Sequence, residues 1–230
     1  MRIENSLLHG RCNEKKTFEL DGSLGNHKVA PDYMNGVAST VAVIAIGLFS
    51  SESFRFGSLV GLAHLIIKIV PVVLFSRGEN ERSKFSKEIM EENAFDTGVA
   101  IPVLEETIFR LGLQTSLRSL FTMTLPSSIV VLPFGIALSS AAIGAILVSS
   151  AIFGAVHLSN EHDSVVTQAL SAFSGGLVKG YLMEVDGFVA ACAAHIVNNA
   201  GLIVPIKVCL AAFGESDQAT DSSSVEVDSA

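Results

Sequence analysis

A stretch of apolar sequence with charged residues at its centre constrains this chain more than any other feature. Between Gly98 and Leu117 the residues read GVAIPVLEETIFRLGLQTSL, about the length of helix that crosses the hydrocarbon core of a bilayer. Glu105, Glu106 and Arg110 lie in its middle. A charge at that depth costs roughly 2.5 kcal/mol or more, so ionisable residues inside a span usually face a polar cavity and serve a function.

The spacing of these charged residues indicates which of them pair. Glu106 and Arg110 are four positions apart, so they lie on one helix face and can form an ion pair. A purely structural role is a sufficient explanation for that pair taken alone. Glu105 is left without a partner on its own helix, and we expect its partner to come from another part of the chain.

Composition favours a membrane protein. Of the 230 residues 49% are hydrophobic and 17% are charged, and the mean hydropathy is +0.50. The net charge of -8 is concentrated in a linker and in the C-terminal tail, so it does not indicate binding to nucleic acid. We therefore expect an all-α fold, a polytopic transmembrane helical bundle of about six spans. A soluble protein is the weaker alternative, because this chain is short for burying so many apolar helices.

Residues 1–34 are predicted to form a polar arm, residues 35–213 the membrane domain, and residues 214–230 an acidic tail that is disordered by composition. The polar stretch from Ser76 to Asp96 is expected to hold a helix at the membrane interface. The other expected apolar segments are Gly36–Ser51, Phe56–Phe75, a short or re-entrant segment to about Leu138, Ser139–Leu158, Val165–Met183 and Gly187–Phe213. Two pairs of glycines four residues apart, Gly57 with Gly61 and Gly176 with Gly180, suit close helix contacts.

Basic residues predict the orientation in the membrane. The arm and the Ser76–Asp96 linker are rich in them, whereas the loop between the first two apolar segments has only Arg55. Those of the arm and linker are Arg2, Arg11, Lys15, Lys16, Lys28, Arg77, Arg82, Lys84 and Lys87. The positive-inside rule therefore places the N-terminus on the cytoplasm-equivalent side of an integral, multi-pass membrane protein.

Polar residues at two later positions are candidate partners for Glu105. His157 closes one apolar segment, and His195 and Asn199 lie four residues apart on one face of the last segment. Asn198 is expected to point about 100° away from that face, and His64 is expected to be an ordinary hydrogen-bonded core residue. A carboxylate, imidazoles and a carboxamide drawn from several helices can together hold a water molecule or a metal ion.

These residues fall into three motifs that resemble a known family. Glu105 to Arg110 matches EExxxR, Phe153 to His157 matches FxxxH, and His195 to Asn199 matches HxxxN. In this order on successive apolar helices, the motifs resemble the CPBP family of intramembrane proteases, which includes the type II CAAX prenyl endopeptidases and bacteriocin-processing or bacteriocin-immunity proteins. The resemblance covers a catalytic core at about 98–211. One departure is an apolar segment around 129–138 that is longer than the family usually has.

The resemblance implies hydrolysis of a peptide bond within the membrane. Glu105, helped by His157, would bind and deprotonate a water molecule. His195 and Asn199 would face the developing oxyanion, for which N–H groups are suitable donors. The implied partners are membrane lipid and a protein or peptide substrate, with or without a prenyl group, and no nucleic acid. The sequence identifies no cavity for a prenyl chain.

Arg110 would hold Glu106 ionised and fix the rotation of the helix that directs Glu105 inward. Whether a divalent metal such as zinc takes part is open: Glu105, His157 and His195 are the possible ligands. The chain lacks the HExxH motif of helix-borne zinc hydrolases and the GxSxG motif of serine hydrolases.

Two other functions are alternatives to an endopeptidase. A non-proteolytic scaffold or immunity-type protein of the same fold would keep the polar pocket and use it to bind a partner. A small transporter or proton relay could use His64, Lys68, Glu105 and His157. A relay predicts a continuous polar path across the bilayer, whereas a protease predicts a pocket that is open to one side.

Overall fold

The computed structural model describes residues 31–75, 92–131, 136–159 and 165–213. Most of the predicted polar arm, nearly all of the predicted interfacial helix and the whole acidic tail lie outside these ranges. Their predicted structure, and the orientation inferred from their basic residues, stay predictions.

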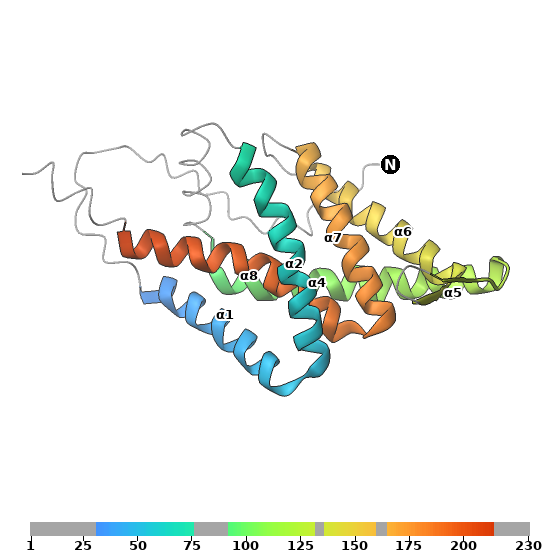
Figure 1. Ribbon diagram of the computed structural model, residues 1–230, viewed down its shortest axis with the longest axis horizontal. Coiled ribbons are helices and arrows are strands. Elements are labelled where there is room, and N and C mark those ends of the chain that lie inside the picture. Colours follow the sequence, from blue (N-terminus) through green and yellow to red (C-terminus); the bar gives the residue numbers. More distant parts are fainter. Residues whose placement is uncertain (1–30, 76–91, 132–135, 160–164, 214–230) are drawn as a thin grey trace, which may run out of the picture.

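The described part is mostly helical, as the sequence predicts, and the helices cross one another in a bundle (Figure 1). In chain order the elements are α1 (Pro31–Ser50), α2 (Glu52–Phe75), η1 (Asp96–Ala100), α4 (Ile101–Glu106), η2 (Thr107–Gln114), α5 (Thr115–Thr124), β1 (Ile129–Val131), β2 (Ala137–Ser139), α6 (Ser140–Val156), η4 (His157–Ser159), α7 (Val165–Val185) and α8 (Phe188–Phe213). The helix bounds agree with the predicted apolar segments to within a few residues at most ends.

The predicted charged helix is part of one longer helix made of η1, α4, η2 and α5. Its η1 and η2 segments are π-helical, whereas α4 between them is α-helical. π-Helical turns are rare and are found frequently at functional sites. In this helix η2 begins directly after Glu106 and contains Arg110, so the change of helix type falls within the predicted motif.

Helices α2 and α8 pack closely through the glycine pair that the sequence singled out. A side-chain carbon added at Gly57 would overlap the backbone of Ala190, and one added at Gly61 would overlap that of Ala194. This confirms the predicted close contact. It also brings the polar residues of α2 beside those of α8.

Helices α6 and α7 lie side by side, and small residues again set their distance (Figure 1). A Cβ atom at Gly176 would lie 3.0 Å from Ser150 Cβ, and one at Gly154 would lie 2.9 Å from the carbonyl oxygen of Ala169. Helix α6 begins with Ser139 as its N-cap, whose hydroxyl accepts a hydrogen bond from the amide of Ala142 at 3.1 Å.

The expected short or re-entrant segment before α6 is an antiparallel hairpin of β1 and β2, in which Ile129 pairs with Ser139 and Val131 with Ala137. The all-α expectation is therefore wrong for this segment. Pro126 disfavours a helix there, and the run of β-branched residues that follows it favours a strand. The hairpin also accounts for the unusually long connection between the first two motifs.

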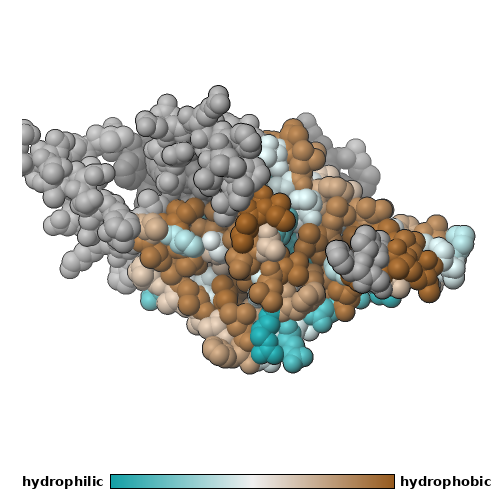
Figure 2. All heavy atoms as spheres, viewed as in Figure 1, coloured by the Kyte–Doolittle hydropathy of each residue, from teal (hydrophilic) through white to brown (hydrophobic). Residues whose placement is uncertain are grey.

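Two helical stretches in the described part are long and apolar enough to cross a membrane, Ser140–Ser159 and Phe188–Cys209, and Met34–Ser50 is a shorter apolar helix. The predicted count of about six spans is therefore not established. Apolar side chains dominate the visible described surface (Figure 2). Phe49 is 89% exposed and Ile67 69% exposed, and apolar surface of this extent marks contact with lipid or with a partner.

Candidate active site

Glu106 lies at the centre of a buried polar network, and its side chain is 0% exposed. Its Oε2 accepts a hydrogen bond from Arg110 Nε at 3.0 Å, which confirms the ion pair predicted from the spacing. Its Oε1 lies 2.7 Å from His195 Nδ1 and 3.3 Å from Lys179 Nζ. Glu106 therefore joins the charged helix to α7 and α8.

The network continues from Arg110 toward α6 and α7. Arg110 Nη1 donates to Gln114 Oε1 at 3.2 Å and to Ser149 Oγ at 3.1 Å. Gln114 Nε2 donates to the carbonyl oxygen of Gly180 and to Glu184 Oε1, each at 3.0 Å. Buried charges are tolerated when they are paired and hydrogen-bonded, and these residues meet that condition.

Glu105 is placed differently from its neighbour. Its side chain is 27% exposed, and its Oε2 lies 3.5 Å from His195 Nε2. This contact confirms that Glu105 finds a partner on another helix. His195 thus lies between the two glutamates, with Nδ1 toward Glu106 and Nε2 toward Glu105, and the short contact with Glu106 fixes the orientation of its ring.

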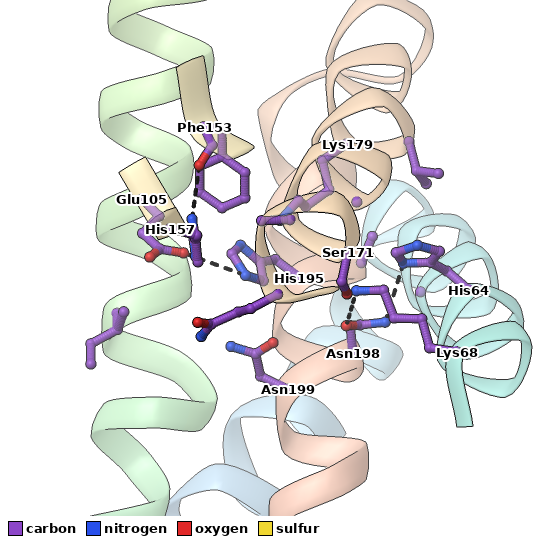
Figure 3. Close-up of a pocket in the computed structure, with 17 residues that line it drawn as sticks. His64, Lys68, Glu105, Phe153, His157, Ser171, Lys179, His195, Asn198 and Asn199 are labelled. Carbon is purple, nitrogen blue, oxygen red and sulfur yellow. Dashed lines mark hydrogen bonds and ion pairs between the residues drawn. The ribbon is translucent and has the colours of Figure 1, made fainter. Parts of the chain in front are cut away.

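The structure brings the predicted catalytic residues to one cavity of about 230 Å³ (Figure 3). Glu105, His157, His195 and Asn199 all line it, as the sequence analysis expected. Glu106 and Arg110 are buried behind them. Other polar residues that line the cavity are His64, Lys68, Gln168, Ser171, Lys179 and Asn198.

Phe153 holds the two histidines in place. Its ring packs edge-on against His157 at 4.7 Å and against His195 at 6.2 Å between ring centroids. Lys179 Nζ lies 4.6 Å from the centroid of the same ring, within cation–π range. His157 Nδ1 lies 2.8 Å from the Phe153 carbonyl oxygen, so Nδ1 is the donor and Nε2 is left for the cavity.

Asn199 lies on the same helix as His195 and lines the cavity with it. Its Nδ2 donates to the carbonyl oxygen of Thr97 at 3.3 Å, which ties α8 to η1 at the start of the charged helix. The amide has a second N–H, and that donor is available to a group in the cavity.

One expectation about the surrounding residues is wrong and another holds only in part. Asn198 is expected to point away from the face of His195 and Asn199, but it lines the cavity. His64 is hydrogen-bonded as expected, but it is only partly buried and lines the cavity as well. Asn198 Nδ2 lies 3.3 Å from His64 Nδ1, and Lys68 Nζ donates to Asn198 Oδ1 at 3.4 Å. Asn198 and Asn199 are three and four residues after His195, so both side chains lie near the helix face that carries His195. The cavity extends around α8 far enough to include both of them.

Sequence reasoning missed Lys179 and Gln114. Lys179 lies near the end of the expected apolar segment Val165–Met183, and it is buried against Glu106. Gln114 continues the four-residue spacing of Glu106 and Arg110, and this regular spacing was the signal available for finding it. Gly176 and Gly180 flank Lys179, and small residues beside a lysine indicate a closely packed helix face.

The residues around the cavity do not form a recognisable metal centre. Within the four described ranges, no group of three His, Cys, Asp or Glu side chains is arranged to hold a metal ion. Glu105, His157 and His195 share the cavity without forming such a group.

Comparison with known families adds to this geometry. Residues 93–201 match the family model described as Type II CAAX prenyl endopeptidase Rce1-like. This segment is an Rce1-like domain of the CPBP family. The family is a membrane-embedded protease family, and the match spans all three motifs of the chain. Helices α1 and α2 lie outside the matched segment. No curated protein and no solved structure matched the chain.

Proposed function

We propose that this protein is an intramembrane endopeptidase that uses Glu105 to activate a water molecule, as in CAAX-type proteases. The observation that carries the proposal is the position of Glu105 at the cavity. Its partly exposed carboxylate lies 3.5 Å from His195 Nε2, while the buried Glu106 holds the other side of the same ring. Carboxylate, imidazole and water are the usual parts of general base catalysis.

Glu105 and His157 both line the cavity, so a water molecule there can be held between a carboxylate and an imidazole. The carboxylate of Glu105 would take a proton from this water as it attacks the peptide carbonyl. His157 Nε2 would orient the water, since His157 Nδ1 is engaged by the backbone of Phe153.

His195 would change its role during the reaction. With the ring proton on Nδ1, which faces Glu106, Nε2 is free to accept the proton that Glu105 has taken from water. The resulting imidazolium would donate a hydrogen bond from Nε2 to the negatively charged oxygen of the tetrahedral intermediate, and Asn199 would supply a second N–H. As the intermediate collapses and the C–N bond breaks, Nε2 would give its proton to the leaving amine nitrogen, which returns His195 to its neutral form. The buried charge of Glu106 would stabilise the imidazolium, as a carboxylate does in other catalytic triads.

Arg110 and Lys179 are positioning residues in this mechanism. Both contact Glu106, and together they compensate its charge in a site with 0% exposure. Because Glu106 orients His195, a change in either cation would act on the reaction through that histidine.

The family is named for CAAX prenyl substrates, and we extend that substrate class to this chain: a protein or peptide with a prenylated cysteine near its C-terminus. The exposed apolar side chains around the bundle fit an enzyme that meets its substrate in the lipid phase.

The test is cleavage of a farnesylated CAAX-type peptide by the full chain in proteoliposomes. Glu105→Gln keeps the shape of the side chain and should lower kcat by about 10²–10⁴-fold. The Tm should be unchanged, because Glu105 is not part of the buried network around Glu106. The activity of the unmodified chain should survive an excess of chelator.

Two results would count against the proposal. Unchanged turnover in the Glu105→Gln variant would refute the catalytic role of Glu105 and favour a scaffold of the same fold. Loss of activity in chelator that zinc restores would show that a metal takes part.

A further inference from the structure

A second group of polar residues occupies the wall of the cavity where α2 packs against α8. It consists of His64, Lys68 and Asn198, which we call the Lys68 cluster (Figure 3). Asn198 lies at its centre, with its Oδ1 accepting from Lys68 Nζ at 3.4 Å and its Nδ2 3.3 Å from His64 Nδ1. His64 and Lys68 lie outside the segment that matches the family.

Lys68 differs from the other buried cations in having no anionic partner. Arg110 and Lys179 both pair with Glu106. Among the residues that the structure describes, no carboxylate forms an ion pair with Lys68, and its one hydrogen bond is to a neutral amide. A partly buried ammonium without a counter-charge is costly, and an anion that entered the cavity would offset that cost.

The cavity of about 230 Å³ is the space open to a ligand beside the ammonium, and Lys68, His64 and Gly175 all line it. Gly175 on α7 has no side chain, so the ring of His64 packs close to its backbone: an added Cβ would lie 3.2 Å from His64 Cε1. Gln168 Oε1, which also belongs to a residue of the cavity, has no hydrogen-bond partner within the described ranges. That oxygen is buried below the cavity surface, so it is not a contact for a ligand. The wall thus offers a cation for a negative group.

We propose that the Lys68 cluster binds the free carboxylate at the C-terminus of the peptide substrate. The proposal rests on the proposed function, because the cluster and Glu105 line the same cavity. A carboxylate held on Lys68 would set the register of the peptide and so select which peptide bond reaches Glu105. A single ammonium with an amide N–H beside it suits a small, singly charged group.

The experiment measures binding and so does not depend on turnover. The full chain is reconstituted in nanodiscs as the Glu105→Gln variant, which retains the ligand. Fluorescence anisotropy then reports binding of three labelled farnesylated peptides. One ends in a free carboxylate, one ends in a carboxamide, and the third ends in a carboxamide but carries a glutamate side chain at its last residue.

The free acid should bind about tenfold more tightly than either amide, because a hydrogen bond to a charged group contributes that much. Adding Lys68→Met should weaken binding of the free acid to the level of the amide, and Lys68→Arg should restore most of the difference. Arg55→Met removes an exposed cation from the same helix, and it should leave the preference for the free acid unchanged.

Equal binding of the acid and the amide would overturn the proposal, as would a Lys68→Met variant that weakens both peptides equally. Tight binding of the glutamate peptide would instead assign the cluster to a side-chain carboxylate and overturn the C-terminal assignment. These failures are distinct from failure of the proposed function. Glu105-dependent cleavage with no preference for the acid would remove only the subsite, whereas a preference in binding with no cleavage would remove only the peptidase activity.

Discussion

Glu105 and Glu106 are neighbours in the chain, yet they lie in opposite environments. Glu106 has 0% exposure and contacts Arg110, Lys179 and His195. Glu105 is 27% exposed and makes one longer contact, to His195. The region behind Glu106 is buried and linked by ion pairs and hydrogen bonds, with Arg110 Nη2 left without a partner within the described ranges, whereas the region in front of Glu105 is an open cavity.

In the proposed mechanism, this difference lets one motif supply both a rigid support, Glu106, and a reactive group, Glu105. A carboxylate that already has three partners has little capacity for a water molecule. A carboxylate with one distant partner can accept several more hydrogen bonds. The two environments therefore predict that substitutions in the buried network around Glu106 reduce stability, whereas substitutions at the cavity beside Glu105 reduce catalysis. Three experiments test this prediction.

The largest expected effect on stability is at Arg110. Arg110→Met removes the guanidinium and leaves a buried carboxylate with fewer partners, so the free energy of unfolding should fall by about 3–5 kcal/mol. The measurement is thermal unfolding in detergent, beside Glu105→Gln as the matched variant on the cavity side. A Tm equal to that of the unmodified chain would show that the network is not what supports the fold.

A smaller effect, on catalysis alone, is expected at Asn199. If its amide faces the oxyanion, Asn199→Ala should lower kcat by about 10²-fold with little change in KM, because the donor acts in the transition state. Its hydrogen bond to Thr97 adds only about 0.6 kcal/mol, so the Tm should change little. A variant that loses stability but keeps kcat would make Asn199 a structural link between helices.

The smallest effect is expected at the outer end of the network. Arg118 Nη1 lies 2.7 Å from Glu184 Oε2, but the Arg118 side chain is 54% exposed. Arg118→Met should therefore lower the free energy of unfolding by about 1 kcal/mol or less. The same thermal unfolding series measures it. A loss as large as that of Arg110→Met would mean that the network is equally important along its whole length.

Local spacing made part of this site predictable. The pair of Glu106 and Arg110 follows from positions four residues apart on one helix, and the contact of α2 with α8 follows from Gly57 and Gly61. The helices themselves follow from runs of apolar residues, whose ends are marked by charge, proline or glycine. These features depend on neighbours in the sequence, which can be read directly.

Contacts between distant helices were less predictable. The position of Lys179 beside Glu106 depends on the rotation of α7 against η2, which no local pattern specifies. The same holds for Asn198. The width of the cavity decides whether it reaches only the face of α8 that carries His195 and Asn199 or also the neighbouring face that carries Asn198. The hairpin of β1 and β2 was missed because a short apolar run between prolines does not distinguish a strand from a short helix.

The close packing of α2 on α8 joins two parts of the chain at one cavity. The residues proposed to react lie in the segment that matches the family, whereas Lys68, proposed to bind the substrate end, lies on a helix outside that segment, which contacts the α8 backbone at Gly57 and Gly61. Relatives could therefore exchange this helix to recognise other substrate ends while leaving the hydrolytic machinery intact.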